Sequence, residues 1–139
     1  MFALGLLLLG MARAQAVERT LSIQAPATAA AGQAFEVVLS AATDAGHGEQ
    51  VGFLQADVSV NGGETWTALC YLQQAGPKVA QKATVTPGAA GSLVKLRVRA
   101  AFRDGLAGDV DYTGAALRWH AEWKDWQSPP ARQAAVTIR

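Results

Sequence analysis

The stretch Gly52–Leu72, GFLQADVSVNGGETWTALCYL, decides the fold of this chain. Its first arm alternates in polarity, with Leu54, Ala56, Val58 and Val60 on one face and Gln55, Asp57 and Ser59 on the other. Such alternation predicts a strand with one face in the core and one in water. Asn61-Gly62-Gly63 supplies the positive φ angles of a tight turn, and the return arm Thr65–Tyr71 is rich in β-branched and aromatic residues. We therefore expect a β-hairpin.

Five further segments alternate in the same way, each with one apolar face. They are Thr20–Ala25 (Leu21, Ile23), Gln33–Ala42 (Phe35, Val37, Leu39, Ala41), Gln81–Thr86 (Ala83, Val85), Ser92–Arg103 (Val94, Leu96, Val98, Ala100, Phe102) and Arg132–Arg139 (Ala134, Val136, Ile138). After the N-terminal segment no stretch has the 3.6-residue period of a helix, and turn signals recur about every 8 to 12 residues. The sequence predicts an all-β, antiparallel β-sandwich of about seven strands, built as a single domain over residues 17–139.

The N-terminal segment has the features of a secretory signal peptide. An apolar run, Ala3–Met11, is followed by small residues that offer A-x-A cleavage sites after Ala14 or Ala16. The run is too short to span a bilayer, although no Lys or Arg precedes it. We expect residues 1–16 to be removed and the mature chain, without a membrane span, to be secreted, periplasmic or on the cell surface. The alternative is an apolar N-terminal strand or helix.

Charge and cysteine content exclude several classes of partner. Loss of Arg13 with the signal peptide reduces twelve Lys and Arg to eleven, against eleven Asp and Glu. A near-neutral chain does not indicate a nucleic acid or an anionic membrane as partner. The single cysteine, Cys70, cannot form a disulfide within the chain and is expected to be a small buried residue. Pairing between chains or action as a nucleophile are the alternatives.

The hairpin turn contains a motif known from other proteins. The segment Ser59–Trp66, SVNGGETW, resembles the Asp box, the S-x-D-x-G-x-T-W hairpin that repeats in sialidases and related propellers. Four positions match and Asn61 stands at the Asp position; the matching residues are Ser59, Gly63, Thr65 and Trp66. The resemblance implies a structural role, in which polar side chains bond the turn and the Trp packs beneath it. Single boxes are also similar to hairpins in immunoglobulin-like sandwiches of secreted bacterial proteins, which implies that fold here.

A long segment, residues 104–131, separates the last two expected strands and holds three of the four tryptophans. The string Trp123–Pro129, WKDWQSP, resembles the W-x-x-W-x-[ST]-P tail of fibronectin type III-like domains. It is also similar to the W-S-x-W-S box of cytokine receptors, although Lys124 and Gln127 replace the two serines. The resemblance implies that the indole rings stack on arginines of the neighbouring strand, here Arg97, Arg99 or Arg103.

The same segment offers three sites with chemistry of their own. A carbohydrate-binding platform would use the flat faces of Trp119, Trp123, Trp126 and Tyr112. A calcium site would use the carboxylates of Asp104, Asp109 and Asp111. A glycan hydrolase would use Glu122 and Asp125 as its pair of acids, although such a pair needs a deep cleft. Elsewhere, Asp44, His47 and Glu49 form a weak zinc pattern, so no cofactor or metal is expected.

The longest expected strand has a basic face opposite its apolar one, formed by Lys95, Arg97, Arg99 and Arg103. This face is either a rail for polyanionic glycans or a solvated surface whose charges pair with Glu36, Asp57 or other acids.

These observations favour an exported, non-catalytic interaction module of the cell surface or extracellular space. Its partner would be a glycan or another surface protein. A carbohydrate-binding module is the alternative, and a glycan hydrolase is a distant third.

Overall fold

The computed structural model describes residues 16–104 and 127–139, and these form eight strands and no helix. The strands are β1 (Arg19–Gln24), β2 (Thr28–Ala29), β3 (Phe35–Thr43), β4 (Glu49–Ser59), β5 (Thr67–Tyr71), β6 (Lys78–Val85), β7 (Leu93–Asp104) and β8 (Arg132–Ile138). Residues 1–15 of the expected signal peptide and most of the 104–131 segment lie outside the described residues. Within the described ranges, no helical segment has the length and apolarity needed to cross a bilayer.

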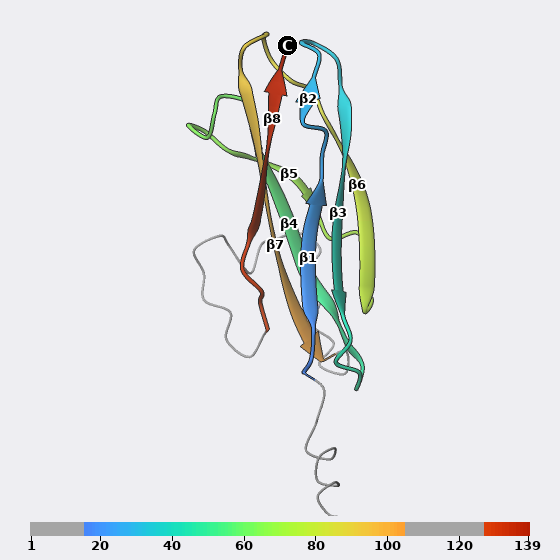
Figure 1. Ribbon diagram of the computed structural model, residues 1–139. Coiled ribbons are helices and arrows are strands. Elements are labelled where there is room, and N and C mark those ends of the chain that lie inside the picture. The colour runs from blue at the N-terminus through green and yellow to red at the C-terminus, as the bar shows by residue number, and fades with distance from the viewer. Residues whose placement is uncertain (1–15, 105–126) are drawn as a thin grey trace, which may run out of the picture.

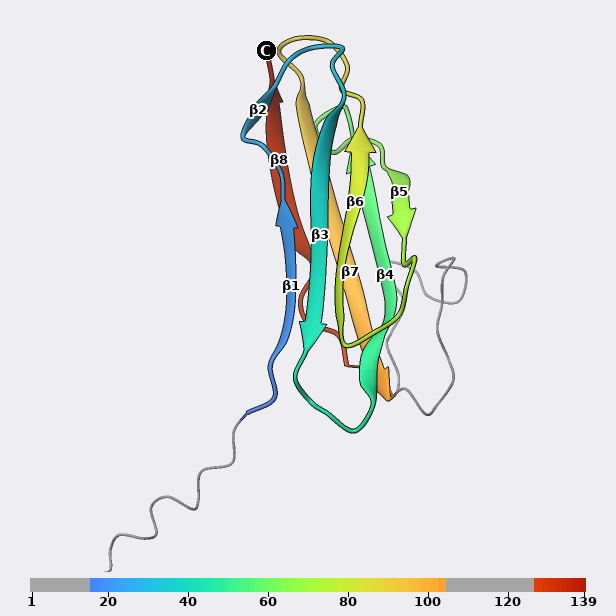
Figure 2. The same ribbon diagram turned by 90° about the vertical axis from the view of Figure 1, so that its right-hand side faces the viewer.

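The strands form two facing sheets, which Figures 1 and 2 show from two sides. One sheet has the order β1-β3-β6, and the other has the order β2-β8-β7-β4-β5. In the letters used for immunoglobulin domains, β8-β7-β4-β5 follows the order G-F-C-C′. The predicted all-β, immunoglobulin-like antiparallel sandwich is therefore confirmed. The strand that pattern reading missed is β2, whose two residues pair in parallel with β8.

The N-terminal strand changes sheets at Pro26. Before it, β1 pairs with β3; after it, the Ala27 carbonyl accepts a hydrogen bond from Thr137 N at 3.0 Å. Proline has no N–H to donate to a ladder, so it suits this crossing. The switch places short β2 along the last two residues of β8.

The core lies between the sheets and contains the apolar faces expected from the sequence. The inward residues of β7 are each at most 1% exposed: Val94, Leu96, Val98, Ala100 and Phe102. They pack against Val37 and Leu39 of β3 and against Val136 and Ile138 of β8. Burying each large apolar side chain contributes about 1.5–3 kcal/mol, so this strand is the centre of the sandwich.

The first hairpin arm departs from its expected wet face. Asp57 and Ser59 are 4% and 1% exposed, whereas Val60, expected inward, is 44% exposed. Asp57 is buried because it pairs with Arg97 on the adjacent strand, and the hydroxyl of Ser59 turns back into the turn. Val60 lies beyond the last residue of β4, where the alternation no longer applies. The prediction for these three residues was wrong, and each error has a local cause.

Two strands begin earlier than their sequence patterns indicate. β4 starts at Glu49, before the expected hairpin stretch Gly52–Leu72, and β6 starts at Lys78 rather than Gln81. The early part of β6 is rich in Lys, Ala and Gln, which have low strand propensity. It is a strand nevertheless because it pairs with β3 in continuous register.

Candidate functional site

Most of the residues proposed for ligand binding lie outside the described part of the chain. These are Tyr112, Trp119, Trp123 and Trp126 of the carbohydrate platform, Asp109 and Asp111 of the calcium site, and the acid pair Glu122 and Asp125. Asp104 ends β7, and only its backbone is described. These three sites remain predictions. Among the described residues, the β4–β5 hairpin and the strand beside it form the candidate site.

A hydrogen-bonded network holds the turn between β4 and β5. The Ser59 hydroxyl donates to Asn61 Oδ1 at 2.8 Å and accepts from Gly63 N at 2.8 Å. Asn61 Oδ1 also accepts from Thr65 N at 3.0 Å, and Asn61 Nδ2 donates to Thr65 Oγ1 at 2.9 Å. Asn61 thereby bonds both sides of the turn. Short side chains that bond nearby backbone stabilise turns, so this network fixes the hairpin locally.

Glycine is required at the apex because the backbone is left-handed there. Gly63 has a φ of 99°, and a Cβ built on it would lie 3.3 Å from Lys95 Cδ and 3.8 Å from the Trp66 ring. Gly62, with φ 75°, donates its N–H to the carbonyl of Leu93 at 3.0 Å. The turn is therefore tied to the start of β7 as well as to itself.

Trp66 follows the turn in sequence, and its side chain lies on the outer face of the five-stranded sheet. Its indole Nε1 donates to the Gly63 carbonyl at 3.1 Å, and the Arg97 guanidinium stacks over its ring at 4.1 Å from the centroid. Stacking of arginine on tryptophan is a favourable cation–π contact. This arginine–tryptophan stack was not assigned from the sequence. The stack expected for the tryptophans of the 104–131 segment lies outside the described residues.

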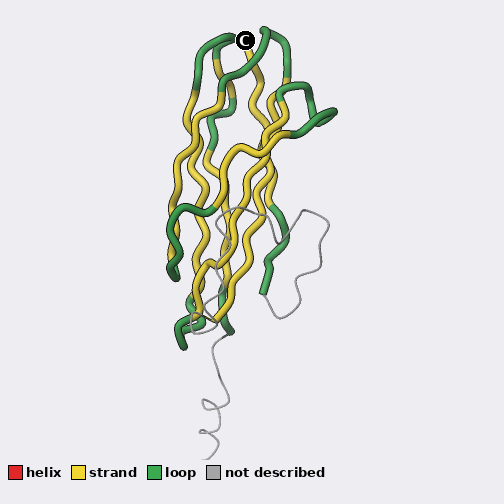
Figure 3. The backbone as a smooth tube through the Cα atoms, turned by 180° about the vertical axis from the view of Figure 1, so that it is seen from behind, coloured by secondary structure: helices red, strands yellow, loops and turns green. Residues whose placement is uncertain are grey.

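The stack continues into β4 through an ion pair. Arg97 donates from Nη2 and Nε to Asp57 Oδ2 at 3.0 and 3.2 Å, and Gln55 Nε2 donates to Asp57 Oδ1 at 2.9 Å. Both carboxylate oxygens of the buried Asp57 are satisfied in this way. We call Trp66, Arg97, Asp57 and Gln55 the outer ladder. Trp66 directly precedes β5, Arg97 lies on β7, and Asp57 and Gln55 lie on β4, which pairs with both of these strands. Figure 3 draws the strands of both sheets in yellow.

The basic face of β7 is engaged within the protein at Arg97. The expected pairing with Asp57 is present, but Glu36 lies on β3 of the other sheet, where it is 3.9 Å from Lys82. Glu36 was therefore wrong as a partner of this face. Burial lowers the pKa of Arg99, as expected for a cation partly withdrawn from water. These contacts favour the paired sheet face over an open rail for polyanions.

The weak zinc pattern does not assemble. Glu49 accepts two hydrogen bonds from Arg19, both at 2.8 Å, and another from Thr43. Asp44 accepts from Glu18 N at 2.7 Å. Among residues 16–104 and 127–139, no group of three or more His, Cys, Asp or Glu side chains is placed to hold a metal.

One polar side chain that pattern reading had not singled out joins the two sheets at their open edge. Gln81 of β6 is 5% exposed; its Nε2 donates to the Tyr71 carbonyl at 2.7 Å, and its Oε1 accepts from Gln73 N at 3.1 Å. The amide thus bridges the end of β5 and the start of the loop that follows. Its inward position between Val79 and Ala83 was the available sequence signal.

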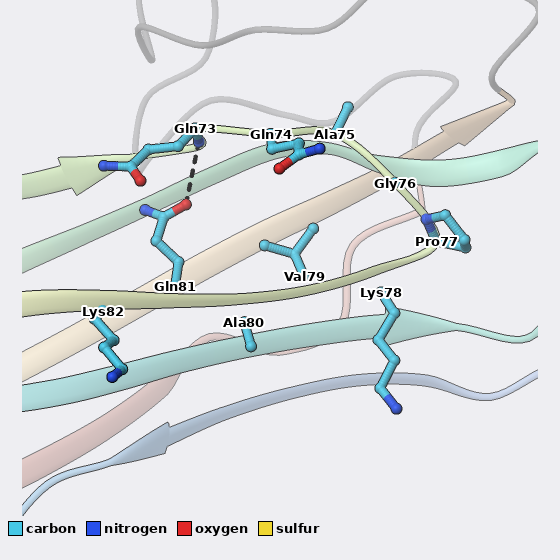
Figure 4. Close-up of a pocket in the computed structure, with 10 residues that line it drawn as sticks. All are labelled: Gln73, Gln74, Ala75, Gly76, Pro77, Lys78, Val79, Ala80, Gln81 and Lys82. Carbon is cyan, nitrogen blue, oxygen red and sulfur yellow. Dashed lines mark hydrogen bonds between the residues drawn. The ribbon is translucent and has the colours of Figure 1, made fainter.

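Gln81 lies in a hollow of about 570 Å³ along the loop between β5 and β6. Figure 4 shows Gln81 and Val79 pointing toward the Gln73–Pro77 segment, whereas Lys78 and Lys82 point away. The hollow is lined mainly by polar groups and main chain, and its central amide already has partners. We interpret this hollow as part of the edge where β5 of one sheet meets β6 of the other, and we call this edge the seam.

Cys70 lies beside this seam, partly buried. Burial raises the pKa of its thiol, an effect that a hydrogen bond with Gln81 partly opposes. Because the thiolate is the reactive form, a raised pKa disfavours the reactive form of this sulfur.

Comparisons with protein-family models, curated proteins and solved structures found no significant match to this chain.

Proposed function

We propose that this chain is an exported, non-catalytic immunoglobulin-like module that binds a cell-surface or extracellular partner through the outer face of its five-stranded sheet. The observation that carries the proposal is the outer ladder. Trp66 and Arg97 are both partly exposed there and are held in place by Asp57 and Gln55. Tryptophan and arginine are the side chains that dominate binding energy at protein interfaces. Fixing them before binding lowers the entropic cost of association.

The flanking strand extends this face without crowding it. Outward positions of β8 are Gln133 and Ala135, which lie opposite Arg97 and Lys95 of β7 and are exposed. Uncharged side chains beside an aromatic and arginine centre suit a partner that lies flat on the sheet. The outer face of β1-β3-β6 has no comparable centre among its described residues; it shows small and polar side chains and the exposed pair Lys82–Glu36.

Three of the described acids have structural roles. Asp57 is paired with Arg97, Glu49 with Arg19, and Asp44 caps a main-chain N–H. A general acid or base needs a carboxyl group with a perturbed pKa facing a cleft. Among the described carboxyl groups, that of Glu49 has a shifted pKa. Its pKa is lowered, mainly by the hydrogen bond from Arg19. Structural ion pairing accounts for it.

Export is supported by the apolar run and the A-x-A sites before residue 17. The protein is expected outside the cytoplasm with a new N-terminus at Gln15 or Val17. N-terminal mass analysis of the extracytoplasmic fraction tests this part of the proposal. An intact Met1 in cytosolic protein would contradict it.

Carbohydrate binding is the second candidate function, resting on the tryptophan-rich segment that contains Trp119, Trp123 and Trp126. The two proposals differ in what displaces the bound protein. A glycan-binding module would be released by soluble glycans, whereas a module that binds a protein surface would not.

The decisive experiment is a binding isotherm of fluorescently labelled residues 17–139 on washed cells of the producing organism. We expect saturable binding that unlabelled protein displaces and that a panel of neutral and anionic glycans leaves unchanged. Displacement by one glycan class would move the assignment to the carbohydrate-binding candidate. Binding that rises linearly without saturation would contradict both.

A further inference from the structure

The apex of the hairpin contains a dipeptide with chemistry of its own, Asn61-Gly62. In such a pair the Gly62 nitrogen can attack Asn61 Cγ, because glycine has no side chain to shield its amide. The N–Cγ bond forms, the Cγ–Nδ2 bond breaks, and ammonia leaves with a proton transferred through solvent. Water then opens the resulting succinimide to leave aspartate or isoaspartate at position 61.

The folded turn opposes this attack at both reacting groups. The nucleophile is engaged because Gly62 N–H donates to the Leu93 carbonyl at 3.0 Å. The electrophile is engaged because the Asn61 amide makes three hydrogen bonds of 2.8 to 3.0 Å with Ser59 and Thr65. For the bond to form, the amide must rotate and the Gly62 N–H must be released. Both require the turn to open.

The aspartate product fits the same turn. In the network, Oδ1 accepts from the Ser59 hydroxyl and from Thr65 N, and a carboxylate accepts both equally well. The remaining bond runs from Nδ2 to Thr65 Oγ1; the threonine hydroxyl can reverse it by donating to the second carboxylate oxygen. Lys95, beside Gly63 in this turn, places a cation near the new charge. Isoaspartate would lengthen the backbone and displace Gly63 N from Ser59.

We propose that Asn61-Gly62 is a self-modification site, at which spontaneous deamidation proceeds through opening of the hairpin and yields aspartate, which the folded turn accepts, together with isoaspartate, which it does not. The product replaces the one residue that departs from the S-x-D-x-G-x-T-W pattern. The modification adds one negative charge two residues before Gly63, which lies beside Lys95 and Trp66. It does not depend on the binding function proposed above.

The test follows the Asn61 peptide by mass spectrometry during incubation of residues 17–139 at mildly alkaline pH, in buffer and in denaturing urea. We expect deamidation to be at least about tenfold slower in the folded protein, equivalent to an opening free energy of about 1.4 kcal/mol or more. Equal rates in the two conditions, or no deamidation of the unfolded chain, would overturn the proposal.

Variants of the network separate turn opening from global unfolding. Ser59→Ala removes one partner of the Asn61 amide and Thr65→Ala removes another at an exposed site; each is expected to speed deamidation of the folded protein. The matched control is Thr84→Ala, an exposed threonine of β6 remote from the turn. Far-ultraviolet circular dichroism verifies that each variant is folded. Folded variants that deamidate at the parent rate would show that the network does not restrain the reaction.

Two substitutions at position 61 test whether the folded turn accepts the aspartate product. Asn61→Asp is expected to keep the parent's urea unfolding midpoint, because every hydrogen bond of the turn has a counterpart. Asn61→Ala, which keeps none of the side-chain bonds, is expected to lower it. If both substitutions lower the midpoint equally, the turn does not accept a carboxylate and the proposal fails.

Discussion

Asp57 is a buried carboxylate whose side chain is 6% exposed and forms an ion pair with Arg97. Truncation would remove the carboxylate that the guanidinium of Arg97, with a 25% exposed side chain, contacts at 3.0 Å. Breaking a buried pair costs more than the pair contributes, since the remaining charge stays desolvated. Because Arg97 retains some contact with water, we expect Asp57→Ala to lower the free energy of unfolding by about 2–3 kcal/mol in urea titrations. The matched surface change, Lys82→Ala, should cost less than about 0.5 kcal/mol; similar losses for both would contradict this account.

Glu49 gives the sandwich a defined sensitivity to acid. Hydrogen bonds from Arg19 lower the pKa of this carboxyl in the folded state, so the folded protein binds fewer protons than the unfolded chain in that range. The resulting stability is present above the ordinary glutamate pKa of about 4.3 and is lost as pH falls through the depressed folded value. We expect Glu49→Gln to be less stable than the parent at neutral pH. Below the ordinary glutamate pKa, its unfolding free energy should depend less steeply on pH than that of the parent. The exposed-site comparison is Glu36→Gln, and a parent-like slope in Glu49→Gln would disprove the linkage.

At the scale of elements, the β4–β5 hairpin depends on its left-handed apex. Gly63 has φ 99° and its built Cβ meets Lys95 and Trp66, whereas Gly88 has neither a positive φ nor a neighbour within 4 Å. We expect Gly63→Ala to lower the free energy of unfolding by about 1–2 kcal/mol. Gly88→Ala should be neutral or stabilising by up to about 1 kcal/mol. Thermal unfolding of the two variants provides the comparison, and the reverse order would show that the turn is not strained by a side chain.

The seam between β5 and β6 depends on one amide. Gln81→Leu keeps a similar volume but leaves the Tyr71 carbonyl and Gln73 N–H without their partner. An unsatisfied buried polar group costs about 1–3 kcal/mol, and part of this loss is expected as local opening. Hydrogen exchange at Gln73 and alkylation of Cys70 by iodoacetamide should both become faster. The exposed neighbour Gln74→Leu is the control; equally slow exchange and alkylation in the two variants would mean that Gln81 does not close the seam.

These elements also show what sequence patterns could predict. The inward faces of β1, β3, β7 and β8 were readable because each has an apolar residue at every second position, and a two-residue period places one set of side chains in the core. The start of β6 was not readable, because its strand state depends on pairing with β3 rather than on its own residues. The two residues of β2 carry no period at all. Burial of Asp57 required knowing that Arg97 lies beside it across 40 positions of sequence.

At the scale of the whole molecule, two sheets of different width present two unlike outer faces. The wider sheet carries the outer ladder, and its polar contacts arise from residues that are remote in sequence but adjacent in register. Pattern reading assigned the basic side of β7 and the aromatic residue of the turn separately; their contact could not be predicted because register is a tertiary property. The proposed binding therefore involves one face of the sandwich, the outer face of the five-stranded sheet.

Binding through this face is tested most directly by placing arginine substitutions on each of the two outer faces and measuring each variant in the same cell-binding isotherm. Gln133→Arg and Ala135→Arg alter exposed positions on the wider sheet, and Ser22→Arg and Ala80→Arg alter exposed positions on β1 and β6. If the wider sheet is the binding face, its two variants should bind at least about tenfold more weakly, while the other two keep the parent affinity. Loss of binding in Ser22→Arg and Ala80→Arg, with parent-like binding in Gln133→Arg and Ala135→Arg, would contradict the account.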